Sequence, residues 1–178
     1  MEIRKLEKLN GNPTLAWGLN GCRTDKIFVV SAIETGTSFE FSLREKNQPY
    51  IKTLKIPAED MEELNGVIAQ GHSFGAFHEE ELIGWAICDY RKRNNSLFIK
   101  NLLVSEAFRG QATGRLLIKN INREARELQC RIVETETRNT NYPAIRFYRK
   151  AGFEITGINT KRYQDSTETA VFMSFELI

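Results

Sequence analysis

The sequence predicts an α/β (α+β) layer fold in which helices flank a mixed, mostly antiparallel sheet. Three strand-like runs follow one another between residues 72 and 104, separated by short polar turns, which favours an antiparallel meander. Beyond residue 110 the apolar residues recur at helical spacing. The rest of the chain alternates strand, helix and strand, an order typical of α/β layers with a mixed sheet.

The part of the chain before the meander contains two strand-like segments and one helix. Residues 27–33 (IFVVSAI) form a short apolar run that indicates a buried strand, and residues 39–43 alternate as a half-buried strand does. A helix is predicted over residues 57–70, because Pro57 stands at its start, acidic residues follow in its first turns, and Gly71 stands just past its end.

The predicted meander is made of three strands and two turns. Its strands are residues 72–77, 82–90 and 96–104. Glu79, Glu80 and Glu81 form the first polar connection. Asn94 and Asn95 form the second, because asparagine tolerates the left-handed backbone that a tight hairpin turn requires.

Helices and strands alternate in the second half of the chain. A helix is predicted after Arg109 and Gly110, and its apolar stripe consists of Leu117, Ile121, Ala125 and Leu128. The elements predicted after it are a strand over residues 130–137, a helix over 143–150, and two strands over 153–160 and 168–177.

Length and composition indicate one soluble domain over residues 1–178, with 41% hydrophobic and 27% charged residues. Cys22, Cys88 and Cys130 are odd in number and widely spaced, which argues against a disulfide framework and a metal site. A net charge of +2 predicts no nucleic-acid partner, although residues 91–93 form a short basic run. No apolar run reaches the roughly 18 residues of a membrane span, and the charged N-terminus lacks a signal-peptide stretch, so we expect a cytoplasmic protein.

The loop between the last strand of the meander and the next helix carries an arginine and two glycines. The strand ends at Val104, Arg109 and Gly110 follow, and Gly114 stands at the start of the helix. The N–H groups and the dipole at a helix N-terminus favour an anion, and glycine lets the backbone approach a phosphate closely. Arg109 could add a bidentate contact. The loop is therefore a candidate phosphate site, although a turn that only begins a helix would have the same residues.

Two motifs resemble those of the GNAT superfamily of acetyltransferases. The acetyl-CoA signature Q/R-x-x-G-x-G/A is matched by Arg109, Gly110, Gln111, Ala112, Thr113 and Gly114, followed by Arg115. Ala112 stands where the family usually has its first glycine, so weaker or adjusted pyrophosphate binding is expected. Residues 141–153 resemble the segment N-x-P-A-x-x-x-Y-x-K-x-G-F, in the family's order. The resemblance implies a single GNAT-like domain with a splayed parallel strand pair, and acetyl-CoA as the cofactor.

The resemblance also implies roles for individual residues. Backbone groups of Leu102, Leu103 and Val104 would hold the pantetheine arm, and the N–H of Leu103 would meet the oxyanion that develops during acetyl transfer. Tyr148 matches the family's general acid, since a phenol with a pKa of about 10 is protonated at neutral pH, but it could also be a packed aromatic. Asn141 matches a residue that contacts the cofactor, and it could also cap its helix.

A general base is harder to identify. An aliphatic amine with a pKa of about 10.4 arrives charged and must lose a proton, which a carboxylate could accept directly or through water. Residues 96–104 contain no carboxylate, although the family often places one in that strand. Glu136 is the first candidate because it lies near the expected splay. Asp89, Glu134 and Glu168 are candidates for substrate binding, and each of the four could instead belong to a solvated face.

A finer resemblance suggests the acceptor. Residues 39–43 and 49–52 resemble the F-x-L…P-Y-x-K stretch of streptothricin acetyltransferases, and residues 134–137 and 168–170 resemble the same subfamily. Streptothricins carry a β-lysine amine, whose acetylation would remove a charge and give antibiotic resistance. The resemblance therefore implies direct attack by the amine of a small cationic antibiotic, streptothricin or an aminoglycoside-like molecule, in a ternary complex.

Other interpretations remain open. The acceptor could be a polyamine, an amino acid or a protein N-terminus, or the chain could be a non-catalytic acetyl-CoA sensor, which Ala112 and the missing base would favour. Many relatives form a homodimer through their last strands. The apolar residues Phe172, Met173, Phe175 and Leu177 could serve that contact or a core.

Overall fold

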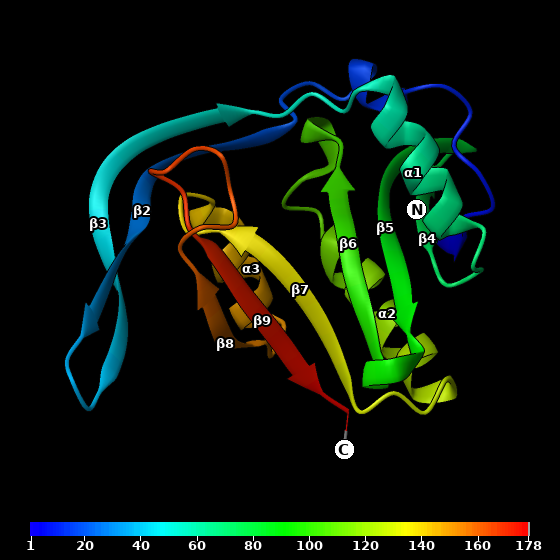
Figure 1. The fold of residues 1–178 in the computed structure, drawn as a ribbon. Coiled ribbons are helices and arrows are strands. Elements are labelled where there is room, and N and C mark those ends of the chain that lie inside the picture. Colours follow the sequence, from blue (N-terminus) through cyan, green and yellow to red (C-terminus); the bar gives the residue numbers. More distant parts are fainter. Residues whose placement is uncertain (178) are drawn as a thin grey trace. The chain divides into compact units, whose positions relative to one another are not determined.

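The computed structural model describes residues 1–177 and confirms the predicted mixed, mostly antiparallel sheet with flanking helices (Figure 1). Among these residues, seven strands are hydrogen-bonded in the order β1-β4-β5-β6-β7-β9-β8, and β2 pairs with β3. The parallel pair is β6 with β7, from Ser96 opposite Ile132 to Ile99 opposite Thr135. The chain divides into two compact units, so the single domain over residues 1–178 stays a prediction.

The first unit comprises residues 1–20, residues 54–135 and the C-terminal end from Phe175. Its elements are β1 (Glu2–Lys5), η1 (Pro13–Ala16), α1 (Ala58–Ile68), β4 (Phe74–His78), β5 (Glu81–Arg91), η2 (Lys92–Asn94), β6 (Ser96–Val104), η3 (Glu106–Phe108), α2 (Thr113–Glu127) and the start of β7 (Ile132–Arg138). The predicted meander is β4, β5 and β6, and both of its turns are confirmed. Glu79, Glu80 and Asn95 have positive φ angles, as tight turns require.

Strand β5 is buried on both faces because each face is covered by a helix. Trp85 and Ile87 belong to the cluster that α1 contributes to through Met61, Leu64 and Ile68. Ala86 and Cys88 alternate with them, are equally buried, and point to the other face, on which α2 packs. The predicted stripe of α2 is confirmed for Leu117, Ile121 and Ala125, which are fully buried, whereas Leu128 is half-buried at the helix end.

Strand β1 was not predicted, because its sequence EIRK is mostly charged. It pairs antiparallel with β4, from Glu2 opposite Phe77 to Lys5 opposite Phe74. An ion pair fixes the position of β1 in addition to its backbone hydrogen bonds with β4. The Glu124 carboxylate lies 2.6 Å from Lys5 Nζ and 2.8 Å from His72 Nδ1. Burial alone would raise the pKa of Glu124, but these two partners outweigh it and leave the pKa lowered.

The second unit comprises residues 21–53 and 136–174. Its elements are β2 (Gly21–Glu34), β3 (Phe39–Thr53), the end of β7, α3 (Tyr142–Lys150), β8 (Glu154–Asn159) and β9 (Ala170–Glu176) up to Ser174. The predicted strands over residues 27–33 and 39–43 exist but are only parts of a long ribbon. The first is not a buried strand, because burial ends after Phe28, and the second is exposed on both faces over most of its length.

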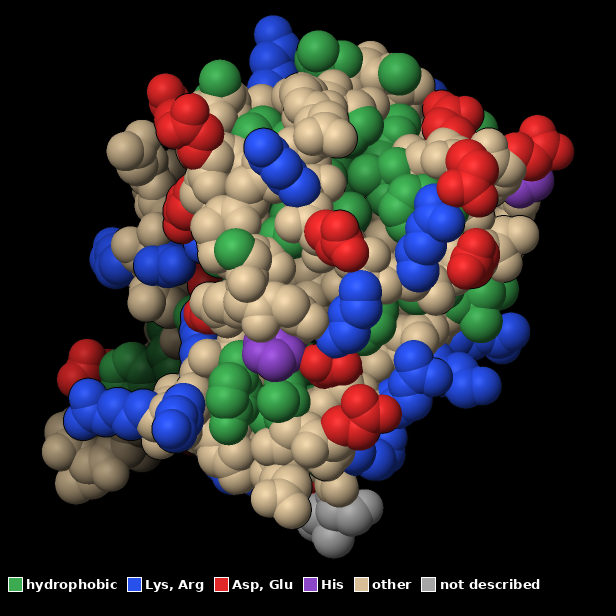
Figure 2. Space-filling view, turned by 90° about the vertical axis from the view of Figure 1, so that its right-hand side faces the viewer, with side chains coloured by type: hydrophobic (Ala, Val, Ile, Leu, Met, Phe, Trp, Pro, Cys, Tyr) green, Lys and Arg blue, Asp and Glu red, His purple; other side chains and the backbone are tan. Residues whose placement is uncertain are grey.

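The cysteines, the surface charges and the helices bear on what the composition predicts. Among residues 1–177, all three cysteines are buried and none of them forms a disulfide. On the face drawn in Figure 2, acidic and basic side chains are intermingled, consistent with the net charge of +2. Within the described chain, none of the helices combines the length and the apolar character of a membrane span.

Candidate functional site

The loop between β6 and α2 has the backbone shape of an anion site. Gly110 and Ala112 both have left-handed φ angles, +76° and +67°. The first helical hydrogen bond of α2 runs from the Leu116 N–H to the Ala112 carbonyl, so the N–H groups of Thr113, Gly114 and Arg115 come before it. The first turn contains no acidic residue, and the N-cap Ala112 has no side-chain acceptor. The positive end of this helix is therefore uncompensated within its own first turn.

Side chains of the signature hold the loop in this shape. Arg109 donates from Nε to the Val104 carbonyl at 2.9 Å and from Nη2 to the Leu19 carbonyl at 2.5 Å. Gln111 and Thr113 donate to backbone carbonyls of η3 at 2.8 and 3.2 Å. These contacts position the loop backbone, so the predicted phosphate contacts of Arg109, Gln111 and Thr113 stay predictions. Arg115 is exposed on the first turn of α2.

Contacts of Glu106 join the same loop to the segment before β2. The Glu106 carboxylate accepts the Leu19 N–H at 2.8 Å, and the Glu106 N–H donates to the Trp17 carbonyl at 2.9 Å. Trp17 is buried against Trp85, with ring centroids 4.8 Å apart, and Trp85 Nε1 donates to the Asn101 side chain at 2.6 Å. These contacts of Glu106 were not predictable from the sequence, because Leu19 and Glu106 are 87 residues apart.

The register of β6 decides which backbone groups face away from β5. The Ser105 N–H donates to a carbonyl of β5 at 2.8 Å, and hydrogen-bonded pairs recur at every second residue of an antiparallel ladder. Leu103, opposite Trp85, is therefore such a pair, and its N–H and carbonyl face β5. The N–H groups of Leu102 and Val104 face the opposite edge of β6.

Two irregularities surround this stretch of β6. Ile87 lies opposite Asn101 and Cys88 lies opposite Ile99, so Lys100 is an extra residue, a β-bulge. Gly84 allows the close approach of the two strands, because a Cβ there would lie 2.9 Å from the Leu103 carbonyl oxygen. The bulge lies in a strand of the parallel pair that the resemblance predicts to be splayed, and the splay itself stays a prediction.

Asn141 and Tyr148 are both on α3, in the second unit. The Asn141 side chain accepts the Ala144 N–H at 3.2 Å, so it caps the helix, and its predicted contact with the cofactor stays a prediction. Tyr148 is buried with its ring next to those of Phe147 and Phe153, at centroid distances of 5.2 and 5.3 Å. The packed aromatic is therefore part of its role, and proton donation stays a prediction.

Two predicted carboxylates lie on one face of the first unit, on either side of Phe98. Asp89 on β5 and Glu134 on β7 are both opposite Phe98 in their registers. Asp89 accepts from Gln70 Nε2 at 3.0 Å and from Arg91 Nε at 3.4 Å. Among residues 1–177, the Oε2 atom of Glu134 is buried and has no hydrogen-bond partner. A buried carboxylate oxygen without a donor is unfavourable, so it is suited to an ammonium ligand.

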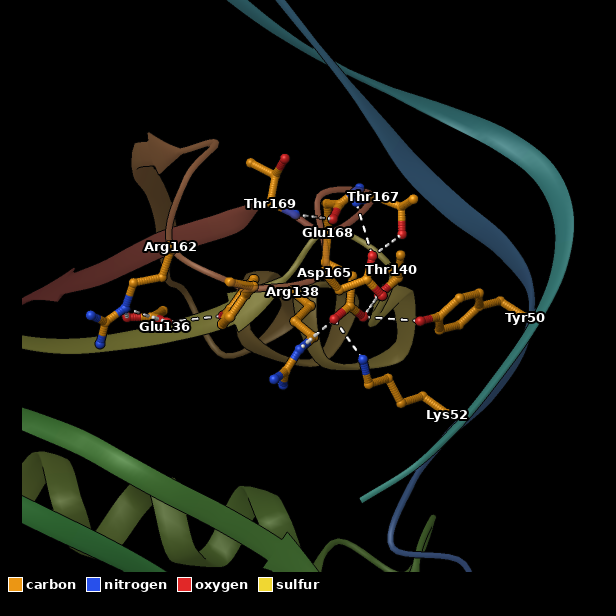
Figure 3. A network of polar contacts seen from close by, with 12 residues as sticks. Tyr50, Lys52, Glu136, Arg138, Thr140, Arg162, Asp165, Thr167, Glu168 and Thr169 are labelled. Carbon is orange, nitrogen blue, oxygen red and sulfur yellow. Dashed lines mark hydrogen bonds and ion pairs between the residues drawn. The ribbon is translucent and has the colours of Figure 1, made fainter. Parts of the chain in front are cut away.

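Glu136, the first candidate for the base, already has protein partners in the second unit (Figure 3). Its two oxygens lie 3.3 Å from Arg162 Nε, and Tyr163 donates its hydroxyl to Oε1 at 2.9 Å. Burial and this hydrogen bond raise the pKa of Tyr163. The Glu136 carboxylate is therefore already engaged by a cation of the protein.

Glu168 is the centre of a buried polar network in the second unit (Figure 3). Its Oε1 accepts from Tyr50 and Thr140, both at 2.9 Å, and its Oε2 accepts from Lys52 at 2.6 Å and Arg138 at 2.9 Å. Burial alone would raise the pKa of Glu168, but these partners leave it lowered. Four donors already bind this carboxylate, so we no longer propose it as a substrate ligand. It ties β3 to the loops around α3.

The C-terminal residues that were candidates for a dimer contact differ in how deeply they are buried. Met173 is buried in the second unit and therefore belongs to its core, while Phe172, Phe175 and Leu177 are half-buried.

Comparison with known proteins places these features in a family context. The model of the acetyltransferase (GNAT) family matches residues 40–153. The streptothricin acetyltransferase of Streptomyces lavendulae is 30% identical over 166 residues, which cover 88% of this chain and 86% of that relative. The spermine/spermidine N(1)-acetyltransferase of Bacillus subtilis (strain 168) is 24% identical over 115 residues, 61% of this chain and 73% of that relative.

Solved structures resemble the fold over nearly the whole chain. The crystal structure of nourseothricin acetyltransferase has a TM-score of 0.77 and 27% identity, and covers 99% of each chain. A structure from Bacillus anthracis str. Ames, in complex with acetyl coenzyme A, has a TM-score of 0.70 and 20% identity over 98% of this chain and 96% of that one.

Proposed function

The chain belongs to the acetyltransferase (GNAT) family and is an N-acetyltransferase that uses acetyl-CoA, and we propose that its acceptor is a primary amine of a small cationic antibiotic of the streptothricin class. The observation that carries the proposal is the loop from Arg109 to Gly114, which leads into a helix N-terminus where the N–H groups of Thr113, Gly114 and Arg115 precede the first helical hydrogen bond. The streptothricin acetyltransferase that covers most of this chain supports the acceptor class.

The residues of the first unit fit the cofactor that the family uses. A Cβ added at Gly110 would meet no atom within 4 Å, so the outer side of the loop is open. The N–H groups of Thr113, Gly114 and Arg115 would hold the pyrophosphate, and the outward backbone of Leu102 and Val104 would hold the pantetheine arm. Bound acetyl-CoA supplies the activated acetyl thioester.

We move the proposed oxyanion donor from Leu103 to Leu102. The Leu103 N–H is directed at β5 by the register, whereas the Leu102 N–H is directed at the opposite edge of β6, beyond the residues Ser96–Ile99 that pair with β7. The Leu102 N–H is not part of the β5–β6 ladder, but the ladder holds the strand that carries it. This N–H is therefore preorganised, which is what the stabilisation of a developing negative charge requires.

Deprotonation of the acceptor is assigned to Glu134. A cationic amine must lose its proton before it can attack, and the carboxylate that accepts the proton should have no competing cation. The buried Oε2 of Glu134 meets this condition, whereas Glu136 is paired with Arg162 and Asp89 with Arg91. Glu136 is the second candidate.

Two residues of α3 complete the proposal. Tyr148 would protonate the leaving thiolate, since a phenol is protonated at neutral pH. Asn141 would contact the cofactor in addition to capping α3. Both assignments rest on the family resemblance of the segment that contains them.

Other amines are the main alternative. The likeness to a spermine/spermidine acetyltransferase favours a polyamine as the second candidate acceptor. Antibiotic resistance and a cytoplasmic location belong to the proposal with streptothricin as substrate, whereas a homodimer is proposed independently of the acceptor.

The decisive experiment mixes the purified protein with acetyl-CoA and one amine at a time, and follows the release of free thiol. Streptothricin, spermidine, an aminoglycoside and a peptide with a free N-terminus form the panel. Fast release with streptothricin supports the proposal. Release with spermidine alone would replace the acceptor, and tight acetyl-CoA binding without release from any amine would favour a sensor.

A further inference from the structure

The ribbon formed by β2 and β3 has an unused strand edge. Among residues 1–177 these two strands pair with each other and with no third strand (Figure 1). The outer edge of β2 is engaged at Phe28, which donates its N–H to the Asn139 carbonyl at 3.0 Å and accepts from Asn139 Nδ2 at 2.7 Å. Over residues 39–45 the outer edge of β3 has no backbone hydrogen-bond partner within the part of the chain that the structure describes. A free edge of this length is a template for another strand.

The same part of the ribbon exposes apolar side chains. The exposed fractions are 41% for Val29, 56% for Ile33, 56% for Phe39 and 44% for Phe41. Residues 31–41 are all exposed, so none of the described residues covers this part of the ribbon. A two-stranded hairpin is marginally stable in water, so a further strand would stabilise it.

The hairpin closure shows which groups of β3 point outward. The Thr35 N–H donates to the Ser38 carbonyl at 2.9 Å, so these two residues form a hydrogen-bonded pair. Pairs of this kind recur at every second residue, and they include Ser31 opposite Ser42. The N–H and carbonyl groups of the intervening residues Phe39, Phe41, Leu43 and Glu45 therefore face the free edge.

The sequence around Ser42 is complementary to itself. Glu40 and Arg44 stand two residues before and after Ser42, and Phe41 and Leu43 stand one residue before and after it. If two copies of β3 pair antiparallel about Ser42, Glu40 of each copy lies opposite Arg44 of the other. Phe41 then lies opposite Leu43 of the other copy, in the positions whose outward groups can hydrogen-bond.

Charge supports this register. Among residues 1–177, neither Glu40 nor Arg44 has an ion-pair partner. In the paired edges they occupy non-hydrogen-bonded positions, where cross-strand side chains approach most closely. We propose that two copies of this chain associate through the outer edges of β3, centred on Ser42, in a two-fold symmetric contact that joins the two ribbons into one four-stranded antiparallel sheet.

The test is the oligomeric state of charge-reversal variants, measured by sedimentation equilibrium over roughly a hundredfold range of protein concentration. The wild-type protein is expected to dimerise. Glu40→Arg and Arg44→Glu should each raise the dimer dissociation constant about tenfold or more, since each creates two like-charged pairs. An equimolar mixture of the two variants should dimerise again, because every pair in the mixed dimer has opposite charges.

Lys46→Glu on the same strand is the matched control. In the proposed register Lys46 lies opposite Ser38, so its reversal should leave the dissociation constant within about twofold. A monomeric wild type overturns the proposal, as does a dimer that neither reversal weakens. Sensitivity to Lys46→Glu without sensitivity to Arg44→Glu overturns the register. The readout is mass, so it is independent of the proposed reaction.

Discussion

Ala112 has a backbone conformation that glycine adopts without steric cost. Its φ of +67° is left-handed, and an L-residue with a Cβ is strained there by roughly 1–2 kcal/mol. The family signature usually has glycine at this position, and the structure gives a physical reason for that preference. The strain is tolerated because Arg109, Gln111 and Thr113 fix the surrounding loop.

Ala112→Gly is therefore expected to stabilise the protein by roughly 0.5–1 kcal/mol, since the relief of strain exceeds the added freedom of the unfolded chain. Urea unfolding measures this change, and titration calorimetry should show acetyl-CoA affinity that is equal or higher. Gly110→Ala is the matched control in the same loop. Its φ is +76° with open space around the new Cβ, so it should destabilise through the backbone alone. A stabilised Gly110→Ala variant would contradict this account.

Glu134 is the proposed base because of one unpartnered oxygen. Glu134→Gln keeps the size of the side chain and removes its basicity. We expect kcat/KM for the cationic amine to fall by roughly 10²–10³-fold, with acetyl-CoA affinity unchanged. Asp89→Asn, on the other side of Phe98, should change kcat/KM by less than about threefold. A large loss in Glu136→Gln with none in Glu134→Gln would transfer the role to Glu136.

Tyr148 combines a packed ring with a hydroxyl that is proposed to donate a proton. Tyr148→Phe keeps the ring contacts, so kcat should fall by roughly 10²-fold while the affinity for acetyl-CoA is retained. Steady-state kinetics and calorimetry separate the two quantities. Tyr142→Phe on the same helix is the control and should leave kcat unchanged. Loss of acetyl-CoA binding in Tyr148→Phe would instead indicate a structural hydroxyl.

At the scale of elements, the β5–β6 ladder fixes the backbone that is proposed to bind the cofactor. A Cβ at Gly84 would lie 2.9 Å from the Leu103 carbonyl oxygen and 3.3 Å from the Val104 Cα, both of them backbone atoms. Gly84→Ala should therefore displace β6, destabilise the protein by roughly 1–3 kcal/mol, and weaken acetyl-CoA binding. Urea unfolding and calorimetry measure the two effects.

Gly66→Ala is the control for Gly84→Ala within the same unit. Gly66 lies in α1, and a Cβ there would meet no atom within 4 Å. This replacement should stabilise the protein by up to about 1 kcal/mol through helix propensity and leave cofactor affinity unchanged. Equal effects of the two replacements on acetyl-CoA binding would contradict the role given to the β5–β6 ladder.

The elements that sequence patterns predicted best are those whose pattern is local. The bounds of β6 were predicted as observed, because an apolar run between a turn and a loop identifies a central strand. The departure of Ala112 from the signature was visible, but its left-handed backbone was not. Strand β1 and the length of β3 were missed, because one is charged and the other is exposed on both faces. Neither has the apolar contrast on which such predictions depend.

The candidate site was predictable only where a motif carries it. The loop from Arg109 to Gly114 was found from its glycines and its place after a strand. The partners of Glu168 were not, because Tyr50 and Lys52 lie 118 and 116 residues away in sequence, and no spacing rule joins them. For the same reason Glu136 was ranked before Glu134 from the sequence, because the ion pair of Glu136 with Arg162 and the unpartnered Oε2 of Glu134 could not be foreseen.

At the scale of the whole molecule, each unit contains a carboxylate whose pKa is lowered in the folded protein. These are Glu124 in the first unit and Glu168 in the second. A lowered folded pKa stabilises the protein above the unfolded value and loses that contribution as the pH falls through the folded value. Unfolding free energy should therefore decrease as the pH falls below the ordinary glutamate value of 4.5.

Glu168→Gln isolates the contribution of Glu168, in the second unit, to this pH dependence of the unfolding free energy. At neutral pH the replacement should cost roughly 2–3 kcal/mol, because Lys52 and Arg138 lose their common partner. The difference between the wild type and the variant should shrink as the pH is lowered through the folded pKa, since the wild-type carboxylate is then neutral as well. Urea titrations at a series of pH values measure it. A difference that is constant with pH would mean that packing, not charge, is responsible.

Trp17 and Trp85 are intrinsic fluorescent probes of the molecule. These are its two tryptophans, both are buried, and both belong to the first unit. Indole emission therefore follows the unit that carries the cofactor loop, while the second unit contributes tyrosine signals alone. Fluorescence and far-ultraviolet circular dichroism, recorded in one denaturant series, compare the unfolding of that unit with the unfolding of the whole chain. Coincident curves would show that the two units unfold together in one cooperative transition. Separate curves would show that each unit has its own stability.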